Sequence, residues 1–334
     1  MPLELISGPQ AFTTLAPQWD NLVATSATNT PFQFLAYQQA WWQHLAPDGA
    51  QLYTFTYSDN DSLQAIACFY LLDNQLHFNG CVEETDYLDI IASADTAPAV
   101  WAAIVDALQE GAIPNCHALD LCNIPAASPS RPILADLATA RNLTHSTTVQ
   151  EVCPIIDLPD SFDDYLGQLD KKQRHEIRRK LRRANGAELE VEMFKGTAEE
   201  LTTAVNLFLD LLQKSTIEKN EWLNDGRRAL FHDTAQAAYQ AGTLQLLFTV
   251  TEDERAATLF NFNYAGRIWV YNSGLDPVAF GYLSPGVVLT ARAIEMAIEN
   301  GQKTFDFLRG DEEYKYQFGA QDSEIFRVQL NLQG

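Results

Sequence analysis

The sequence lacks the long apolar run and the basic leader that mark membrane and secreted proteins. No apolar stretch in its 334 residues approaches the ~18–20 that a membrane span needs. Residues 1–10 show no basic region followed by an apolar stretch, so we expect no secretory signal there. The five cysteines have no C-x-x-C spacing, and we interpret them as reduced core thiols that neither bridge nor bind metal: Cys68, Cys81, Cys116, Cys122 and Cys153. These absences predict a cytoplasmic protein with no membrane span.

The motifs of three common kinds of active site are also absent. The six histidines show no H-E-x-x-H and no other paired spacing, which predicts that no metal is bound. No G-x-S-x-G nucleophile elbow occurs. The two glycines of Gly281-Tyr-Leu-Ser-Pro-Gly286 have the spacing of a P-loop, but the Lys-Ser/Thr that should follow is missing, which excludes an NTPase.

Positive charge is scarce and unevenly placed. Residues 1–150 hold 15 acidic residues and two arginines, whereas residues 151–334 hold 29 acidic and 20 basic residues. The net charge of −22 predicts repulsion from DNA and from anionic membranes.

One segment, Lys171–Arg183, reverses this balance with eight bases and one acid. We interpret it as a clamp for an anionic substrate, such as a phosphorylated acceptor, a lipid-linked precursor or, less favoured, tRNA. The expected binding residues are Arg178, Arg179, Arg182 and Arg183. The alternative is a helix face that is solvated or docked on the acidic first half.

What is present is a repeated order of elements. In the first half we expect helices over residues 9–23 and 34–45, strands over 51–57, 63–72 and 75–79, a helix over 97–109, a strand over 118–122 and a loop over 123–131. In the second half we expect a helix from the Thr197-Ala-Glu-Glu200 capping box, a helix over 225–240, strands over 243–250, 257–264 and 268–273, a helix over 285–300 and a strand over 304–308. The order helix, helix, three antiparallel strands, helix, strand therefore occurs twice. It predicts two α/β (α+β) domains, 1–150 and 151–334, the second led by a basic helix over 161–185.

The start of the helix over 285–300 is an expected anion site. Ser284 suits the N-cap and Pro285 the first helical position. The first amides, at Gly286, Val287 and Val288, should lack intrahelical acceptors and, with the helix dipole, bind pyrophosphate. Gly281 and Gly286 would let the backbone approach a phosphate closely. The alternative is a well-capped helix of the core.

A hydrophobic strand near the C-terminus ends in a dense polar cluster. Residues 305–308 are followed by Arg309, Asp311, Glu312, Glu313, Tyr314 and Lys315. Ligands bind at the carboxyl ends of strands in α/β sheets, and dense charge beside aromatic rings favours a functional site. The alternative is a polar turn followed by an amphipathic helix.

These motifs resemble those of a known superfamily. Residues 258–318 are similar to the acetyltransferase domain of the GNAT superfamily, in Tyr271-Asn-Ser-Gly274, Ser284-Pro-Gly286 and Phe305-Asp-Phe-Leu-Arg-Gly-Asp-Glu-Glu-Tyr-Lys315. The closer resemblance is to a branch linked with cellulose biosynthesis, which is itself similar to the Fem peptidyl transferases. The basic segment ending at Arg183 resembles a helix that precedes the second domain in both groups.

The resemblance implies a fold and a donor. It implies two tandem GNAT-like domains, each a mixed, mostly antiparallel sheet flanked by helices, with the first on the acceptor side or degenerate. It implies acyl-coenzyme A as the donor, with cofactor-binding residues Gly281, Ser284, Gly286, Val287 and Val288. The sequence departs from the usual Q/R-x-x-G-x-G/A loop there, since it has Tyr282-Leu-Ser-Pro-Gly286.

The resemblance also implies a reaction. We expect transfer of an acyl group, acetyl above all, to an amine or hydroxyl of a small-molecule or polymer-precursor acceptor. Asp311 or Glu312 would be the base and Tyr314 the acid, while Tyr271, Asn272, Arg309 and Lys315 would bind substrate. Two alternatives stay open: a Fem-like peptidyl transferase that uses aminoacyl-tRNA, and a non-catalytic GNAT-fold module that binds an anionic partner.

Overall fold

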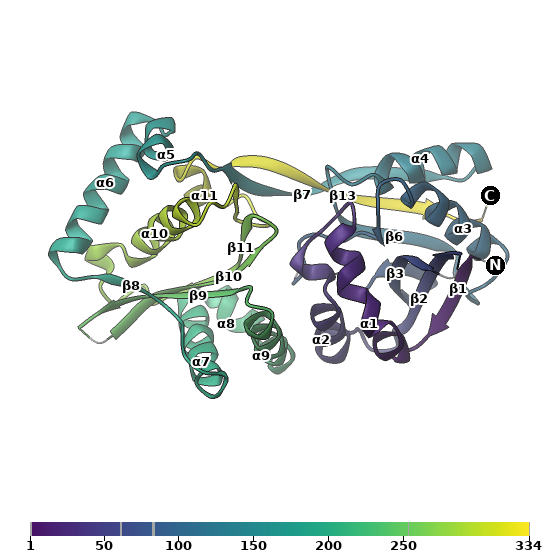
Figure 1. Ribbon diagram of the computed structural model, residues 1–334, viewed down its shortest axis with the longest axis horizontal. Coiled ribbons are helices and arrows are strands. Elements are labelled where there is room, and N and C mark those ends of the chain that lie inside the picture. The colour runs from purple at the N-terminus through teal and green to yellow at the C-terminus, as the bar shows by residue number, and fades with distance from the viewer. Residues whose placement is uncertain (1, 61, 82–83, 253, 334) are drawn as a thin grey trace. The chain divides into compact units, whose positions relative to one another are not determined.

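The chain folds into two compact units in the computed structural model, which describes residues 2–60, 62–81, 84–252 and 254–333 (Figure 1). The first unit runs to Val152 and includes the segment from Ser323 onward, and the second comprises Cys153–Asp322. Strands β7 (His145–Asp157) and β13 (Gln321–Asn331) each pass from one unit into the other. The last residues of the chain, expected in the second domain, therefore belong to the first unit.

The first unit is a mixed sheet with helices on both faces. Its strand order is β1-β2-β3-β4-β6-β13, with β5 paired to β3; β4 and β6 run parallel, and the other paired neighbours run antiparallel. Its elements are β1 (Leu3–Ser7), α1 (Gln10–Thr25), η1 (Pro31–Gln33), α2 (Leu35–Leu45), β2 (Gln51–Asp59), β3 (Ser62–Leu72), β4 (Gln75–Phe78), β5 (Ile91–Ala92), α3 (Ala97–Gln109), β6 (Ala118–Pro125) and α4 (Ser130–Arg141).

Alternate residues of β3 supply the two faces of this sheet, as the two-residue period of a strand requires. Ile66 and Cys68 join the buried cluster of α1, whereas the Phe69 ring lies 6.2 Å from that of Trp101 in α3. Helices α1 and α3 therefore cover opposite faces.

The second unit repeats this plan. Its strand order is β7-β12-β11-β10-β9-β8, with β11 and β12 parallel and the other paired neighbours antiparallel where the pairing is described. Its elements are α5 (Phe162–Gln168), α6 (Lys171–Gly186), β8 (Glu190–Met193), α7 (Ala198–Ser215), α8 (Ile217–Trp222), α9 (Asp225–Gln240), β9 (Leu244–Thr251), β10 (Glu254–Tyr264), β11 (Arg267–Leu275), η2 (Gly281–Leu283), α10 (Pro285–Glu299), β12 (Thr304–Asp306) and α11 (Glu313–Gln317).

Helices α6 and α10 lie on one side of this sheet, and α7 and α9 lie on the other (Figure 1). Leu259 of β10 joins the cluster built on α10, while the next residue, Phe260, lies 5.4 Å from the Phe208 ring of α7. Both faces of this strand are therefore buried, from Ala256 to Phe262.

The structure confirms the repeated order and the tandem fold. Both sets of three central strands are antiparallel, and two-residue turns with positive φ join the last two strands of each set, at Asp73-Asn74 and Ala265-Gly266. The Thr197/Glu200 capping box is formed in both directions.

Three expected elements were wrong in their bounds. The basic helix over 161–185 is two helices, because the Asp170 side chain accepts from the Gln173 amide at 2.8 Å and starts α6 at Lys171. Residues 130–141, partly assigned to a loop, form α4. Strand β12 ends at Asp306, whose carboxylate accepts from the Leu308 amide at 2.8 Å as the chain turns with φ +58° at Leu308.

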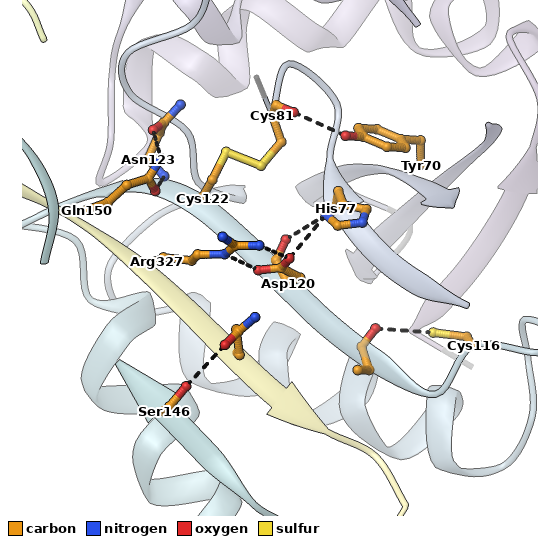
Figure 2. Close-up of polar contacts among 12 residues, drawn as sticks. Tyr70, His77, Cys81, Cys116, Asp120, Cys122, Asn123, Ser146, Gln150 and Arg327 are labelled. Carbon is orange, nitrogen blue, oxygen red and sulfur yellow. Dashed lines mark hydrogen bonds and ion pairs between the residues drawn. A yellow bond between two sulfur atoms is a disulfide. The ribbon is translucent and has the colours of Figure 1, made fainter. Parts of the chain in front are cut away.

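The expectation of five reduced cysteines was also wrong. Cys81 and Cys122 form a disulfide with an S–S distance of 2.02 Å, while Cys68, Cys116 and Cys153 are free and buried (Figure 2). A separation of 41 residues carries no recognisable spacing, so only the pairing of β4 with β6 brings the two sulfurs together. The cysteines therefore no longer argue for a cytoplasmic location.

Candidate functional site

A cavity of about 260 Å³ opens in the second unit where β11 departs from β12. The two strands pair only through Arg267–Trp269 and Thr304–Asp306, although β11 continues to Leu275. The lining is mostly apolar: Ala257, Thr258, Leu259, Val270, Ser273, Gly274, Leu275, Gly286, Val287, Leu289, Thr290, Phe305, Phe307, Tyr314 and Phe318. The splayed strands therefore leave a narrow apolar slot that can enclose an extended ligand.

The start of α10 forms one wall of this cavity through Gly286 and Val287. Our expectation of free amides was wrong at Val287 and Val288, since both donate to the Ser284 carbonyl at 3.1 Å. The Gly286 amide has no acceptor within the described part of the chain. It is the amide left at this helix terminus for an anion.

The other two expected donor-loop residues lie outside the cavity lining. Ser284 stands at the N-cap position as expected, but in a left-handed conformation without a side-chain capping bond. A Cβ at Gly281 would meet nothing within 4 Å. Only Gly286 and Val287, of the five expected residues, touch the cavity.

Tyr314 brings a hydroxyl group to the cavity wall. It lies on α11, is 39% exposed as a residue, and its hydroxyl is hydrogen-bonded by the Ser273 side chain. Burial of the hydroxyl, and then the negative charge of Glu312, raise the pKa of Tyr314. The hydroxyl is thus held protonated at neutral pH, as a proton donor requires.

Lys315 holds the turn that precedes Tyr314. Its ammonium is buried and donates to the carbonyls of Leu308 at 3.1 Å, Arg309 at 2.7 Å and Gly310 at 3.0 Å. It also pairs with Glu312 at 2.8 Å. These four contacts fix a turn with φ +108° at its glycine and orient the Glu312 carboxylate, although Glu312 and Asp311 are both exposed.

The sequence analysis missed Lys219, on the short helix α8. Its Nζ donates to the Ser273 carbonyl at 2.5 Å and to Asn272 Oδ1 at 3.1 Å. Burial lowers the pKa of Lys219 to about 8, against the attraction of Glu312. No motif marks this lysine, because its partners lie more than 50 residues away along the chain.

Tyr271, also expected at the site, is turned away from it. Its ring lies 5.3 Å from that of Phe231 and 5.7 Å from that of Phe260, in the aromatic cluster beneath α7 and α9. A register shift between β10 and β11 next to Phe260 changes the alternation here. Asn272 therefore contacts Lys219, while Tyr271 packs in the core.

The four expected arginines of α6 are divided between two environments. Arg178 and Arg182 line an open groove of about 460 Å³ together with Arg292 of α10. Arg179 instead pairs with Glu176 at 2.6 Å, and Arg183 donates to the Tyr282 carbonyl at 2.8 Å. The groove thus gathers two of the four with a third arginine that the sequence analysis did not select.

In the first unit, a disulfide bridges the point that corresponds to the slot, where β4 and β6 cease to pair. Strands β4 and β6 pair in parallel only through Gln75–Leu76 and Ala118–Leu119, which corresponds to the short pairing of β11 with β12. Beyond that point the Cys81–Cys122 disulfide joins the segment after β4 to β6 (Figure 2). The Asn123 side chain also donates from Nδ2 to the Thr85 carbonyl at 2.6 Å. The first unit is thus cross-linked at the place where the second unit has its slot.

Comparison with known proteins relates the second unit to a family and the whole chain to several solved structures. Residues 171–316 match the family described as the acetyltransferase (GNAT) domain. A search of curated proteins found no match to the sequence. The fold is similar to that of FemX, with a TM-score of 0.66 and 11% identity over 97% of this chain and 96% of that one.

Two further solved structures share the fold. One is L-PGS from Bacillus licheniformis, with a TM-score of 0.62 and 10% identity over 95% of this chain and 92% of that one. The other is the C-terminal domain of a putative lysylphosphatidylglycerol synthetase from Agrobacterium fabrum, with a TM-score of 0.60 and 9% identity over 96% of this chain and 92% of that one. Within the described residues, no helix is both long and apolar enough to cross a membrane. The chain thus has a tandem GNAT-like fold, and its residues 171–316 match the acetyltransferase (GNAT) domain family.

Proposed function

We propose that the protein transfers an acyl group, acetyl in the simplest case, from acyl-coenzyme A to an amine or hydroxyl of a small anionic acceptor. The observation that carries this proposal is the apolar slot between β11 and β12, which has the Gly286 amide at one wall and the Tyr314 hydroxyl at another.

The slot suits the arm of an acyl-thioester donor. Beyond Trp269, the edge of β11 toward β12 has no paired strand among the described residues, which leaves that edge open to an extended chain before Ser273, whose amide and carbonyl already bond to Asn272 and Lys219. The apolar side chains around it suit the methylene groups of that arm. The Gly286 amide and the dipole of α10 would receive the pyrophosphate.

The polar groups at the slot suit direct transfer. The acceptor nitrogen or oxygen would attack the thioester carbonyl, and the carbon–sulfur bond would break. Glu312 would take the proton lost by the nucleophile, and Tyr314 would give its proton to the departing thiolate. Glu312 is the better placed of the two expected carboxylates, because its ion pair with Lys315 at 2.8 Å fixes its position.

The groove lined by Arg178, Arg182 and Arg292 supports an anionic acceptor. Arg178 has only a 3.4 Å contact with exposed Asp163, Arg182 has no ion-pair partner in the described part of the chain, and Arg292 is paired with Glu295 at 2.5 Å. We favour a small phosphorylated acceptor over aminoacyl-tRNA, since a tRNA requires a wider basic surface than one groove in a chain of net charge −22. The first unit would then bind no donor of its own.

A tyrosine pair on one helix tests this proposal. Tyr314→Phe removes the hydroxyl at the slot, whereas Tyr316→Phe removes one that bonds to Asp322 at 2.7 Å. Calorimetry with coenzyme A and acetyl-coenzyme A measures donor binding, and thiol release with a panel of amines, amino sugars and their phosphates measures turnover. We expect Tyr314→Phe to lower turnover about 100-fold or more with donor affinity nearly unchanged, and Tyr316→Phe to change neither. A wild-type protein that binds no coenzyme A thioester would refute the proposal in favour of a non-catalytic module.

A further inference from the structure

Lys219 is a half-buried lysine that takes no part in the proposed proton transfers. It stands on α8, outside the cavity lining, and reaches the one strand that supplies both Ser273 and Gly274 to the slot. Removing an ammonium group from water costs free energy unless its hydrogen bonds are made, and those bonds also restrain the groups that accept them.

Four contacts link Lys219 to Tyr314 through Asn272 and Ser273. Lys219 Nζ donates to the Ser273 carbonyl at 2.5 Å and to Asn272 Oδ1 at 3.1 Å. Asn272 Oδ1 also accepts from the Ser273 amide at 2.9 Å, so the backbone of Ser273 is held on both sides. The Ser273 side chain in turn bonds to the Tyr314 hydroxyl.

This restraint acts where β11 is least supported by its sheet. Strand β12 has ended at Asp306, and the register with β10 shifts between Phe260 and Asn261. A bulged strand without a neighbour on one edge can rotate its side chains, and the ammonium contacts counter this rotation.

The charged groups that face Lys219 come from the segment carrying Tyr314. Glu312 attracts its charge and Lys315 repels it. On its own helix, Glu218 and Glu221 are exposed, and Lys214 of the neighbouring α7 is paired with Asp276 at 3.3 Å. The charge of Lys219 on α8 therefore interacts with both members of the Glu312–Lys315 ion pair.

We propose that Lys219 is a positioning residue of the acyl-transfer site, whose ammonium fixes Ser273 and thereby holds the Tyr314 hydroxyl at the slot. The activity test rests on the proposed function, but the position of the hydroxyl can be tested without any substrate. Three variants suffice: Lys219→Met removes the donor, Lys219→Arg keeps a charged donor, and Lys303→Met is the control, since that side chain is 71% exposed.

The first experiment needs no donor. The protein is labelled with 3-fluorotyrosine, and the fluorine resonance of Tyr314 is identified by its loss in Tyr314→Phe. We expect this resonance to shift in Lys219→Met, to return toward the wild-type position in Lys219→Arg, and to stay in place in Lys303→Met. An unchanged resonance in a folded Lys219→Met protein would overturn the proposal, whatever the fate of the proposed function.

The second experiment measures transfer from acetyl-coenzyme A to the acceptor found in the panel described above. We expect Lys219→Met to lower kcat about tenfold or more while the dissociation constant for acetyl-coenzyme A stays within about twofold. The alkaline loss of kcat should have an apparent pKa near 8 in the wild type and move at least one pH unit higher in Lys219→Arg, because guanidinium stays charged. Equal losses of kcat and donor affinity, with an unmoved pH profile in Lys219→Arg, would instead show a merely structural role.

Discussion

Gly274 of β11 lies against the backbone of Leu212 in α7, so closely that a Cβ on the glycine would stand 2.4 Å from the Leu212 amide nitrogen. Backbone atoms cannot move aside as a flexible side chain can. The absence of a side chain at Gly274 therefore sets how closely α7 packs on the strand that forms the slot.

Gly274→Ala should therefore destabilise the second unit. Forcing apart a packed helix and strand costs about 1–3 kcal/mol or more, and the strand edge at the slot should shift with it. Denaturant unfolding measures the first effect, and calorimetry with acetyl-coenzyme A the second. The matched control is Gly167→Ala, where a Cβ meets nothing within 4 Å. Equal free energies of unfolding for the two variants would contradict this packing argument.

The donor terminus of α10 can be tested with two glycines of one loop. Gly286→Glu places a carboxylate on the helix start at the slot, where a Cβ fits at 3.6 Å from the Leu275 side chain. We expect loss of donor binding by at least tenfold with an unchanged melting temperature, because the new charge repels the pyrophosphate. Gly281→Glu, which projects into open space, should retain more of the affinity. Equal binding by Gly286→Glu and the wild type would remove α10 from the donor site.

The arginines of α6 yield a prediction that compares two double variants. Arg178→Glu with Arg182→Glu reverses charge in the groove, and Arg179→Glu with Arg183→Glu reverses it on side chains that have internal partners. Inorganic pyrophosphate, the probe, should raise the melting temperature of the wild type and of the second variant but not of the first. Added salt should reduce that rise, since the groove is open to solvent.

The groove variant should itself lose little stability, because exposed ion pairs such as Arg178–Asp163 contribute only ~0–1 kcal/mol each. A large drop in its melting temperature, with no pyrophosphate effect on the wild type, would mean that these arginines are structural.

The disulfide predicts the thiol count and the stability of the first unit. Alkylation of the denatured protein should modify three thiols before reduction and five after it. Replacing Cys81 and Cys122 by serine should lower the free energy of unfolding by ~2–4 kcal/mol, as expected for a loop closed across 41 residues. Five reactive thiols without a reductant would show that the pair is not bonded in solution.

Much of the fold follows from local sequence. Apolar spacing predicted the repeated central helices and strands of both units in order, although it missed β1, β7, β8 and β13. The two-residue turns and the capping box depend on residues close together in the chain. The start of the helix at Pro285 was recognisable for the same reason. Such features are set by backbone preferences and short-range hydrogen bonds, which a sequence displays directly.

The site depends on contacts that no local pattern encodes. Lys219 reaches Ser273, Cys81 meets Cys122, and α6 divides its arginines between a groove and internal partners only after sheets and helices have packed. The start of the basic helix was also predicted wrongly. The apolar stripe continues past Asp170, but the side chain of Asp170 caps a new helix there.

The sequence by itself determined the two repeated units and the segments that carry polar groups to the splayed strands. Tertiary structure alone decided which of those groups meet. Tyr314 meets Ser273, Glu312 meets Lys315, and Lys219 meets Ser273 of β11 and the charge of Glu312. The physical reason is that propensity acts over a few residues, whereas partners more than 50 residues apart are selected by the register of the strands and the close packing of helices on them.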